Sequence, residues 1–272
     1  MLKIQFLYLI DYKLIMDFIV MGSGGAIPTP RPFCQCKACS GARKDPSKRR
    51  NSSSLFLKDA SLLVDCGEDI ASSLNRENIK KVENLFITHW HPDHTYGLRP
   101  LLESYFDFRT EKATSTIQLY LPKKVYEQLN EHLNILEHLE NNYGVVKVNF
   151  IEDGESIEFG SIKVTAVGFN GKDSETFGYL FEENEKRVLY TPCDTISFER
   201  EGDFKDLDLL INECGLFEEI GNEILFPDLM ARLKNMGPKK TILTHIEEIE
   251  VNIFGEEYLQ KMKKDYSDIN FE

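Results

Sequence analysis

The stretch Thr88–Leu98 reads T-H-W-H-P-D-H-T-Y-G-L and contains three of the six histidines of the chain. A short apolar run, Glu83–Ile87, precedes it, and apolar residues follow at roughly helical spacing from His94 to Phe106. This pattern predicts a strand, a tight loop and a helix. Imidazole nitrogens and a carboxylate oxygen suit zinc, iron or manganese. The stretch therefore predicts a metal site; the alternative is a charged turn in which histidines happen to cluster.

Composition limits the class of protein. The chain has 272 residues, of which 42% are hydrophobic and 28% charged, as is typical of a soluble globular protein. Its 32 Lys and Arg against 45 Asp and Glu give a net charge of −13. An acidic surface repels polyphosphate backbones, so we do not expect nucleic acid as the partner. A small substrate can still reach a metal ion, because the charge of the ion dominates locally.

The N-terminal segment calls for a separate interpretation. Residues 1–15 are fairly apolar, but Lys3, Asp11 and Lys13 interrupt them, so the segment is too short and too charged to span a membrane. We interpret it as an extension or as the product of a mis-assigned start, with Met16 as the natural start. No linker rich in Ser, Gly or Pro divides the rest, so we expect residues 16–272 to form a single domain.

The cysteines do not form an evenly spread disulfide framework, which indicates a reducing compartment, the cytoplasm. Cys34, Cys36 and Cys39 are clustered as C-x-C-x-x-C in an irregular segment, Pro28–Asn51. The other three are Cys66, Cys193 and Cys214. Three thiolates at this spacing can hold one zinc ion if a fourth ligand comes from elsewhere. The alternative is three buried thiols without metal.

A centre built on the histidine loop needs further ligands from the second half of the chain. Asp194 follows the predicted strand Arg187–Thr191, and His245 follows the predicted strand Thr241–Thr244. Taken singly, the first could be a turn residue and the second a hydrogen-bonded core histidine. Taken with the histidine loop, both are predicted to be ligands.

Strand and helix patterns occur in two comparable halves. The predicted strands are Phe18–Met21, Ser53–Lys58, Ser61–Asp65, Thr116–Leu121, Val145–Ile151, Ser156–Phe159, Ile162–Gly168, Phe177–Glu182, Arg187–Thr191, Leu207–Glu213 and Thr241–Thr244. The predicted helices are Ile70–Arg76, Pro122–Asn142, Pro227–Asn235 and Glu256–Lys264. This order predicts an α+β fold in which two mixed sheets lie face to face with helices outside, a four-layer αββα sandwich. His132 and His138 are six residues apart on one predicted helix, so we expect surface or packing roles for them.

Five motifs together resemble the metallo-β-lactamase superfamily of hydrolases. They are G-S-G-G at 22–25, D-C-G at 65–67, H-W-H-P-D-H at 89–94, P-C-D-T at 192–195 and L-T-H-I at 243–246. The resemblance runs from about Met16 to about Ile246. Within the superfamily, G-A-I-P at 25–28, followed by the cysteine motif and A-R, is similar to the phosphodiesterase of the carbon–phosphorus lyase pathway and to PqqB-type proteins.

The resemblance implies a set of metal ligands. It implies one ion held by His89 and His91, a second held by Asp93, His94 and His245, and Asp194 as the bridge between them. Zinc is the expected ion, at one or two positions, with Mn²⁺ or Fe²⁺ as alternatives, and Asp93 would be the catalytic residue that orients a metal-bound hydroxide. A structural zinc would be held by Cys34, Cys36, Cys39 and Glu248, the last standing where the phosphodiesterase relative has a histidine.

Two departures from the family pattern affect this expectation. The loop 169–176, from which the family supplies a third histidine to the first ion, contains none. Candidate replacements are Asn170, Asp173 and Glu175; otherwise the first site would be weak or empty. No histidine lies between Asp194 and His245, where the relative has its proposed proton donor. Candidates for the leaving-group acid are Glu68, Lys172 and Glu213.

The functional prediction is a metal-dependent hydrolase, first of all a phosphodiesterase for a small or cyclic phosphodiester. One alternative is another ester, thioester or lactone hydrolase, or a transfer-RNA 3′-end nuclease; the acidic charge disfavours the nuclease. Another is a metal-binding accessory protein with little hydrolytic activity. The expected partner is a small phosphodiester or other ester, without nucleic acid or membrane, and a homodimer is left open.

Overall fold

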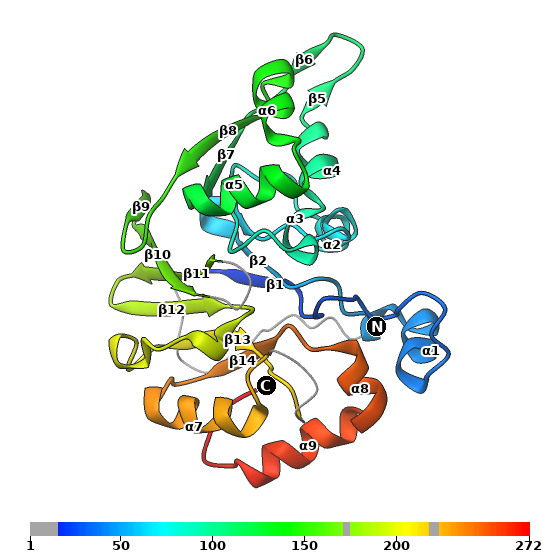
Figure 1. Cartoon of the computed structure of the whole chain (residues 1–272), viewed down its shortest axis with the longest axis vertical. Coiled ribbons are helices and arrows are strands. Elements are labelled where there is room, and N and C mark those ends of the chain that lie inside the picture. Colours follow the sequence, from blue (N-terminus) through cyan, green and yellow to red (C-terminus); the bar gives the residue numbers. More distant parts are fainter. Residues whose placement is uncertain (1–15, 171–174, 218–222) are drawn as a thin grey trace.

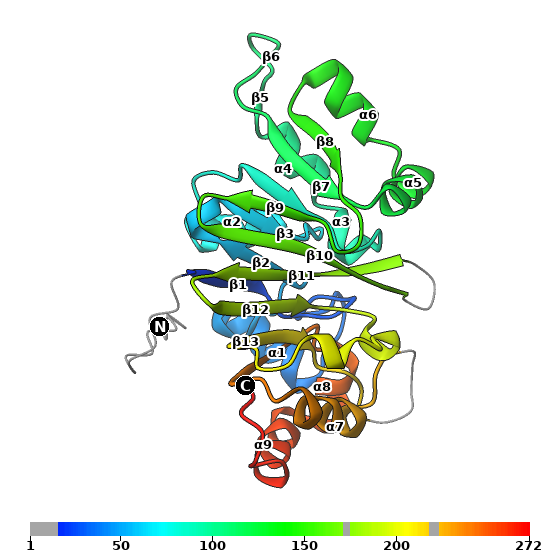
Figure 2. The same cartoon turned by 90° about the vertical axis from the view of Figure 1, so that its left-hand side faces the viewer.

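Two six-stranded mixed sheets lie face to face in the computed structural model, which describes residues 16–170, 175–217 and 223–272. Helices cover the outer faces: α2 to α5 lie in the upper part of Figure 1, on the side of the first sheet, and α7 to α9 lie in the lower part, below β13 and β14 of the second. Figure 2 shows the same layers from the side. The predicted four-layer sandwich is therefore confirmed. The expected extension, residues 1–15, lies outside the described residues.

The first sheet comes from the N-terminal half of the chain. Its strands are β1 Phe18–Gly22, β2 Ser54–Leu57, β3 Leu62–Val64, β4 Asn84–Phe86, β7 Ile117–Leu121 and β8 Val146–Phe150, in the order β1-β2-β3-β4-β7-β8. Pairing is antiparallel from β1 to β3 and parallel from β3 to β8. Its helices are α2 Ile70–Arg76, α3 Pro92–Thr95, α4 Leu98–Glu103, α5 Lys123–His132 and α6 Leu136–His138. A small ribbon, β5 Phe106–Asp107 and β6 Lys112–Ala113, extends at the top of Figure 1.

The second sheet comes from the C-terminal half. Its strands are β9 Ser156–Phe159, β10 Ile162–Asn170, β11 Glu175–Glu183, β12 Lys186–Thr191, β13 Leu209–Glu213 and β14 Thr241–Thr244, in the order β14-β13-β12-β11-β10-β9. Pairing is antiparallel from β9 to β12 and parallel from β12 to β14. Its helices are α7 Phe226–Met236, α8 Glu248–Phe254 and α9 Glu256–Asp265, and α1 Lys37–Lys44 lies near α8 (Figure 1).

Aromatic side chains from both sheets fill the layer between them. Phe86 of β4 packs edge-on against Tyr179 of β11, with ring centroids 5.0 Å apart, and Phe18 of β1 packs in the same way against Phe181. The hydroxyl of the fully buried Tyr179 donates a hydrogen bond to the carbonyl of Ile87, at 2.7 Å. The apolar core thus fixes the second sheet directly beneath the start of the histidine loop.

Three sequence expectations about helices were wrong. The predicted helix Pro122–Asn142 is broken after α5, where Asn134 adopts a left-handed φ of 42°. The predicted helix after His94 is two short helices, α3 and α4. The cysteine segment is not wholly irregular, because it contains α1, whose N-cap is Cys36: its sulfur accepts a hydrogen bond from the Cys39 N–H at 3.3 Å.

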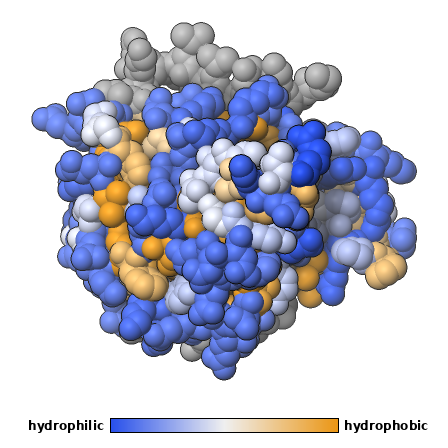
Figure 3. Space-filling model, turned by 90° about the horizontal axis from the view of Figure 1, so that it is seen from above, coloured by the Kyte–Doolittle hydropathy of each residue, from blue (hydrophilic) through white to orange (hydrophobic). Residues whose placement is uncertain are grey.

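Seen from above, the surface of the molecule is mostly hydrophilic, and apolar residues lie between the polar ones, most of them on the left of the view (Figure 3). In the described part of the chain, no helix combines the length and hydropathy needed to cross a bilayer.

Candidate metal centre

Strand ends from both sheets meet at one edge of the sandwich. Asp65 follows β3, Asp194 follows β12 and His245 follows β14, and all three have left-handed backbones, with φ of 63°, 58° and 50°. A non-glycine residue in this conformation costs about 1–2 kcal/mol. Surrounding hydrogen bonds stabilise this backbone conformation. For example, the Ser53 hydroxyl accepts a hydrogen bond from the His245 N–H at 2.9 Å.

The histidine loop follows β4, and glycines allow the neighbouring chain to approach it closely. Pro92 is the first residue of α3, a favourable helix start, which sets Asp93 and His94 in the first helical turn. A Cβ on Gly67 would lie 2.3 Å from the Asp93 carbonyl oxygen, and a Cβ on Gly97 would lie 2.1 Å from the Gly67 carbonyl oxygen. The D-C-G segment and the histidine loop can therefore pack together only with glycine at both positions.

The first group of possible ligands is His89, His91 and Asp194. His89 is fully buried, and its Nε2 lies 3.0 Å from Nδ1 of the half-buried His91. Donor atoms of all three residues lie within 4.8 Å of one another. The hydroxyl of the buried Thr176 donates to Asp194 Oδ2 at 3.1 Å and so orients the carboxylate.

The second group is Asp93, His94 and His245. Asp93 Oδ2 lies 3.2 Å from Nε2 of His94 and 3.2 Å from Nε2 of His245, and all three side chains are buried. The two imidazole rings are nearly parallel, with centroids 5.6 Å apart. The structure thus brings together all six residues predicted as active-site ligands, with Asp194 in the group of His89 and His91.

A set of outer contacts orients these histidines. Asp65 Oδ2 lies 2.9 Å from His94 Nδ1, and Asp65 Oδ1 accepts from the Thr88 N–H at 2.9 Å. The Thr88 hydroxyl lies 3.0 Å from His89 Nδ1, and Glu247 Oε1 lies 3.3 Å from His245 Nδ1. In all three histidines Nδ1 faces a protein partner, so Nε2 is the atom directed at the other possible ligands: His91 in the case of His89, and Asp93 in the case of His94 and His245. The sequence analysis did not assign this role to Asp65 or Glu247.

The pKa shifts match closely packed ligands. Burial works to raise the pKa of Asp93, but the charges of His94 and His245 hold it well below its usual range. Burial works to lower the pKa of His94, but Asp93 and Asp65 raise it well above the ordinary value. Burial, with the neighbouring histidines, holds the pKa of His89 well below the ordinary value. Metal uptake at this site must therefore displace protons, and its affinity falls with acidification.

The donors fit a divalent cation. His94 Nε2 is fully buried and makes no well-formed hydrogen bond among the described residues, although the Asp93 carboxylate lies 3.2 Å from it. A buried nitrogen without a well-formed hydrogen bond is costly, whereas a bound ion at this position would use its lone pair. Nitrogen and carboxylate oxygen donors are those that zinc, iron and manganese accept.

Of the proposed replacements for the missing histidine, Glu175 can be placed, and it is not part of either group. The Glu175 carboxylate pairs with Lys124 Nζ at 3.3 Å. Asn170 is the last residue of β10. Asp173 and Lys172 lie outside the described residues.

Two glutamates lie beside the centre, and the sequence analysis named only one. Glu213 is buried, and its Oε1 accepts from the Thr195 N–H at 2.5 Å. Burial, and then the adjacent Glu223, raise the pKa of Glu213 well above its usual range. Glu223 belongs to a further donor group with His245 and Cys193. Glu68, the other described candidate for the acid, is exposed, and burial raises its pKa above the ordinary value.

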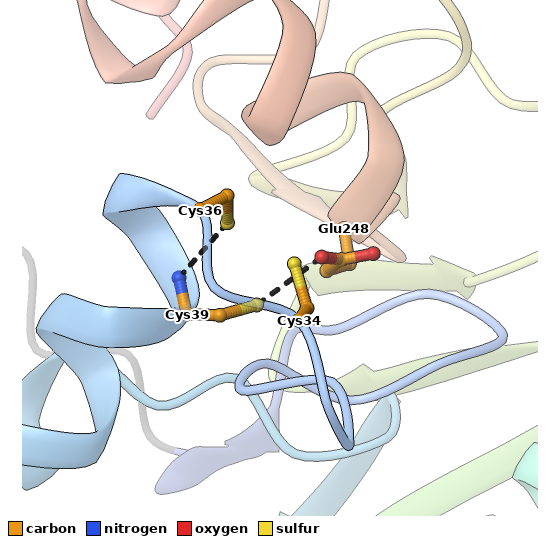
Figure 4. A group of neighbouring side chains, drawn as sticks. All are labelled: Cys34, Cys36, Cys39 and Glu248. Carbon is orange, nitrogen blue, oxygen red and sulfur yellow. Dashed lines mark hydrogen bonds between the residues drawn. The ribbon is translucent and has the colours of Figure 1, made fainter.

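The cysteine cluster forms a second, separate group of donors. Cys34, Cys36, Cys39 and Glu248 offer atoms that all lie within 4.8 Å of one another (Figure 4). Cys39 Sγ lies 3.2 Å from Glu248 Oε1, and Cys36 Sγ lies 2.5 Å from Asn252 Oδ1. The amide of Asn252 also donates to Glu248. The residues predicted for a structural zinc are thus assembled, with Asn252 as a neighbour that the sequence analysis missed.

A family model described as "Beta-lactamase superfamily domain" matches residues 61–246, more than half of the chain. The chain therefore belongs to the metallo-β-lactamase superfamily, a superfamily of metal-dependent hydrolases. The match includes the histidine loop, Asp194 and His245. The predicted family is thus confirmed.

Among curated relatives, the chain is similar to proteins named Ribonuclease Z. One from Limosilactobacillus fermentum is 34% identical over 145 residues, 51% of this chain and 45% of that protein. One from Archaeoglobus fulgidus is 29% identical over 147 residues, 52% of this chain and 45% of that protein. The chain thus spans about half the length of the curated relatives it matches.

Solved structures show the same fold. A diphosphatase described as belonging to the PhnP family has a TM-score of 0.73 and 23% identity over 94% of both chains. Zn²⁺-bound PqqB from Methylobacterium extorquens has a TM-score of 0.77 and 18% identity over 94% of this chain and 97% of its own. Human tRNase Z, short form, has a TM-score of 0.61 and 19% identity over 86% of this chain and 94% of its own.

Proposed function

We propose that this chain is a metal-dependent phosphodiesterase that acts on a small or cyclic phosphodiester. The observation that carries the proposal is the convergence of six buried or half-buried donors from the histidine loop, β12 and β14 at one edge of the sandwich. One or two zinc ions held there, with manganese or iron as alternatives, would lower the pKa of a bound water to about 7 and neutralise charge on phosphate oxygens.

Specific residues would position the reactants. Asp93 is ionised because its pKa is held low, so its carboxylate can both ligate and accept a hydrogen bond from the attacking water. Asp194, oriented by Thr176 and grouped with His89 and His91, would be the bridging ligand. The proton for the leaving group would come from the Glu213 and Glu223 pair, which retains a proton because the two carboxyl groups are buried next to each other.

Two relatives support a phosphorus ester as substrate. The PhnP-family structure is described as a diphosphatase, and the curated relatives as Ribonuclease Z, an RNA-cleaving class by name. A transfer-RNA 3′-end nuclease is therefore the second candidate, favoured by 34% identity over half of the chain. The net charge of −13 opposes it, because polyanion binding requires neutralising cations.

Substrate panels separate these candidates. The purified chain, loaded with Zn²⁺ or Mn²⁺, should hydrolyse bis(p-nitrophenyl) phosphate and cyclic nucleotides faster than thioesters or lactones. The His89→Ala chain should lose this activity. The His132→Ala chain is the matched control and should retain it, because His132 is an exposed histidine that stacks on Trp90 and belongs to neither ligand group.

Other outcomes would identify the alternatives. Cleavage of precursor transfer RNA, strongly weakened by salt, without cleavage of small diesters would establish the nuclease. Full metal loading without hydrolysis of any ester class would establish a metal-binding accessory protein. Elemental analysis of wild type and Cys36→Ala should show one fewer zinc per chain in the variant, because we also propose that the cysteine cluster and Glu248 hold a structural zinc.

The cell compartment is a further proposal. All six cysteines are free thiols. Free thiols persist in reducing surroundings, which supports the cytoplasm as the location.

A further inference from the structure

Cys193 is a buried thiol at the centre of the donor groups. It directly precedes Asp194, is 3% exposed, and offers a sulfur within 4.8 Å of donor atoms of both His89 and His94. The same residue forms another such group with Glu223 and His245. Its sulfur is therefore close to both halves of the centre.

An independent observation points to a ligand at the same place. His94 Nε2 is buried and makes no well-formed hydrogen bond among the described residues, although Asp93 Oδ2 lies 3.2 Å from it and Asp65 fixes Nδ1 at 2.9 Å. With Nδ1 occupied by Asp65, Nε2 is the His94 nitrogen left to join Cys193 and His89 in a three-donor group. A shared cation would satisfy the nitrogen and the sulfur at once.

We propose that the Cys193 thiolate is a direct ligand of the active-site metal, and that with His89 and His94 it forms a nitrogen–sulfur donor set. This set adds a sulfur donor beside His89 of the first group and His94 of the second, in a chain that lacks the third histidine of the family pattern. Thiolate favours zinc and cobalt over manganese and magnesium, which prefer oxygen donors. The inference concerns the composition of the centre and does not depend on which ester is hydrolysed.

The other buried cysteines show that burial alone does not explain this placement. Cys66 and Cys214 are as deeply buried as Cys193, but neither belongs to a group of possible metal ligands in the part of the chain that the structure describes. Buried cysteines of that kind behave as small apolar residues. Cys214, which follows β13 as Cys193 follows β12, is therefore a matched control.

Cobalt titration tests the proposal without an activity assay. Wild type, Cys193→Ser and Cys214→Ser are titrated with Co²⁺, and the sulfur-to-cobalt charge-transfer band is recorded with the number of bound ions. The Cys34, Cys36 and Cys39 group contributes equally to all three spectra, so it cancels in the differences. Cys193→Ser should lose intensity relative to the other two chains, and its zinc affinity should fall at least about tenfold. Equal intensity in all three folded chains would overturn the proposal.

A second measurement decides the question if Cys193→Ser does not fold. The chain with serine at 34, 36 and 39 retains Cys193, and its zinc X-ray absorption spectrum counts sulfur neighbours directly. A sulfur neighbour of the bound zinc supports ligation by Cys193. A shell of nitrogen and oxygen only would refute it.

Discussion

Replacing Asp65 by asparagine should weaken metal binding strongly while the chain still folds. In the native chain Asp65 Oδ1 accepts from the Thr88 N–H and hydroxyl at 2.9 and 3.0 Å, and Oδ2 lies 2.9 Å from His94 Nδ1. Asparagine can keep its oxygen on Thr88, but its NH₂ group then faces His94. To avoid two opposed donors, the imidazole must move its proton to Nε2, the nitrogen that would bind the ion.

The magnitude follows from this tautomer change. Loss of an outer partner of a ligating histidine typically costs about 10–100-fold in metal affinity, or about 1.4–2.8 kcal/mol. Folding should lose less than a truncation would, since two of the three donors keep an acceptor; we expect about 1–3 kcal/mol for the lost charged hydrogen bond. Zinc affinity, measured by competition with a chromophoric chelator, should therefore fall about 10–100-fold.

The control is Asp69→Asn. Asp69 accepts hydrogen bonds from the Ser52 N–H at 3.2 and 3.3 Å and contacts no histidine that the structure describes. This variant should lose stability in urea denaturation but keep its zinc affinity. Wild-type zinc affinity in Asp65→Asn, or an equal loss in both variants, would refute the argument from the tautomer.

Three further predictions concern other parts of the chain. Burial works to raise the pKa of Asp208, but two lysines and a backbone N–H lower it to about 2. The Asp208 carboxylate therefore stabilises the folded chain fully above the unfolded pKa near 4, and this stabilisation is lost as the pH falls towards 2. Asp208→Asn should therefore cost up to about 2 kcal/mol at pH 7 and progressively less below pH 4 in urea titrations. Tyr179→Phe should cost about 1–3 kcal/mol, because the buried Ile87 carbonyl loses its donor, and equal urea midpoints would contradict this. Cys36→Ala should expose α1 to limited proteolysis in zinc-loaded protein, a difference that chelator should abolish.

Local chemistry explains why much of the centre could be predicted from the sequence. His89, His91, Asp93 and His94 lie in one short loop, so their type and spacing indicate metal binding before any fold is known. Asp194 and His245 follow strands that are recognisable by their apolar runs. The role of Asp65 could not be predicted in this way, because its contact with His94 depends on parallel pairing of β3 and β4.

The helices that were missed have identifiable causes. The sequence Glu248–Phe254 places Ile249, Val251 and Ile253 at alternating positions, a strand-like period, and only tertiary packing makes it α8. Cys36 is not among the usual N-cap residues, so the start of α1 carried no recognisable signal. After α5, Asn134 could be recognised as a break only from its left-handed backbone.

The donors of the centre belong to opposite layers of the sandwich, the histidine loop to one sheet and Asp194 and His245 to the other. An ion bound by these donors would act as a cross-link between the two layers, and it could form only after the two sheets have packed together. Before the two sheets pack together, the chain offers the ion the donors of only one sheet. Loading would therefore be a late event in maturation, and stripping the ion would first loosen this edge of the molecule, while the long β10–β11 hairpin would still resist amide exchange.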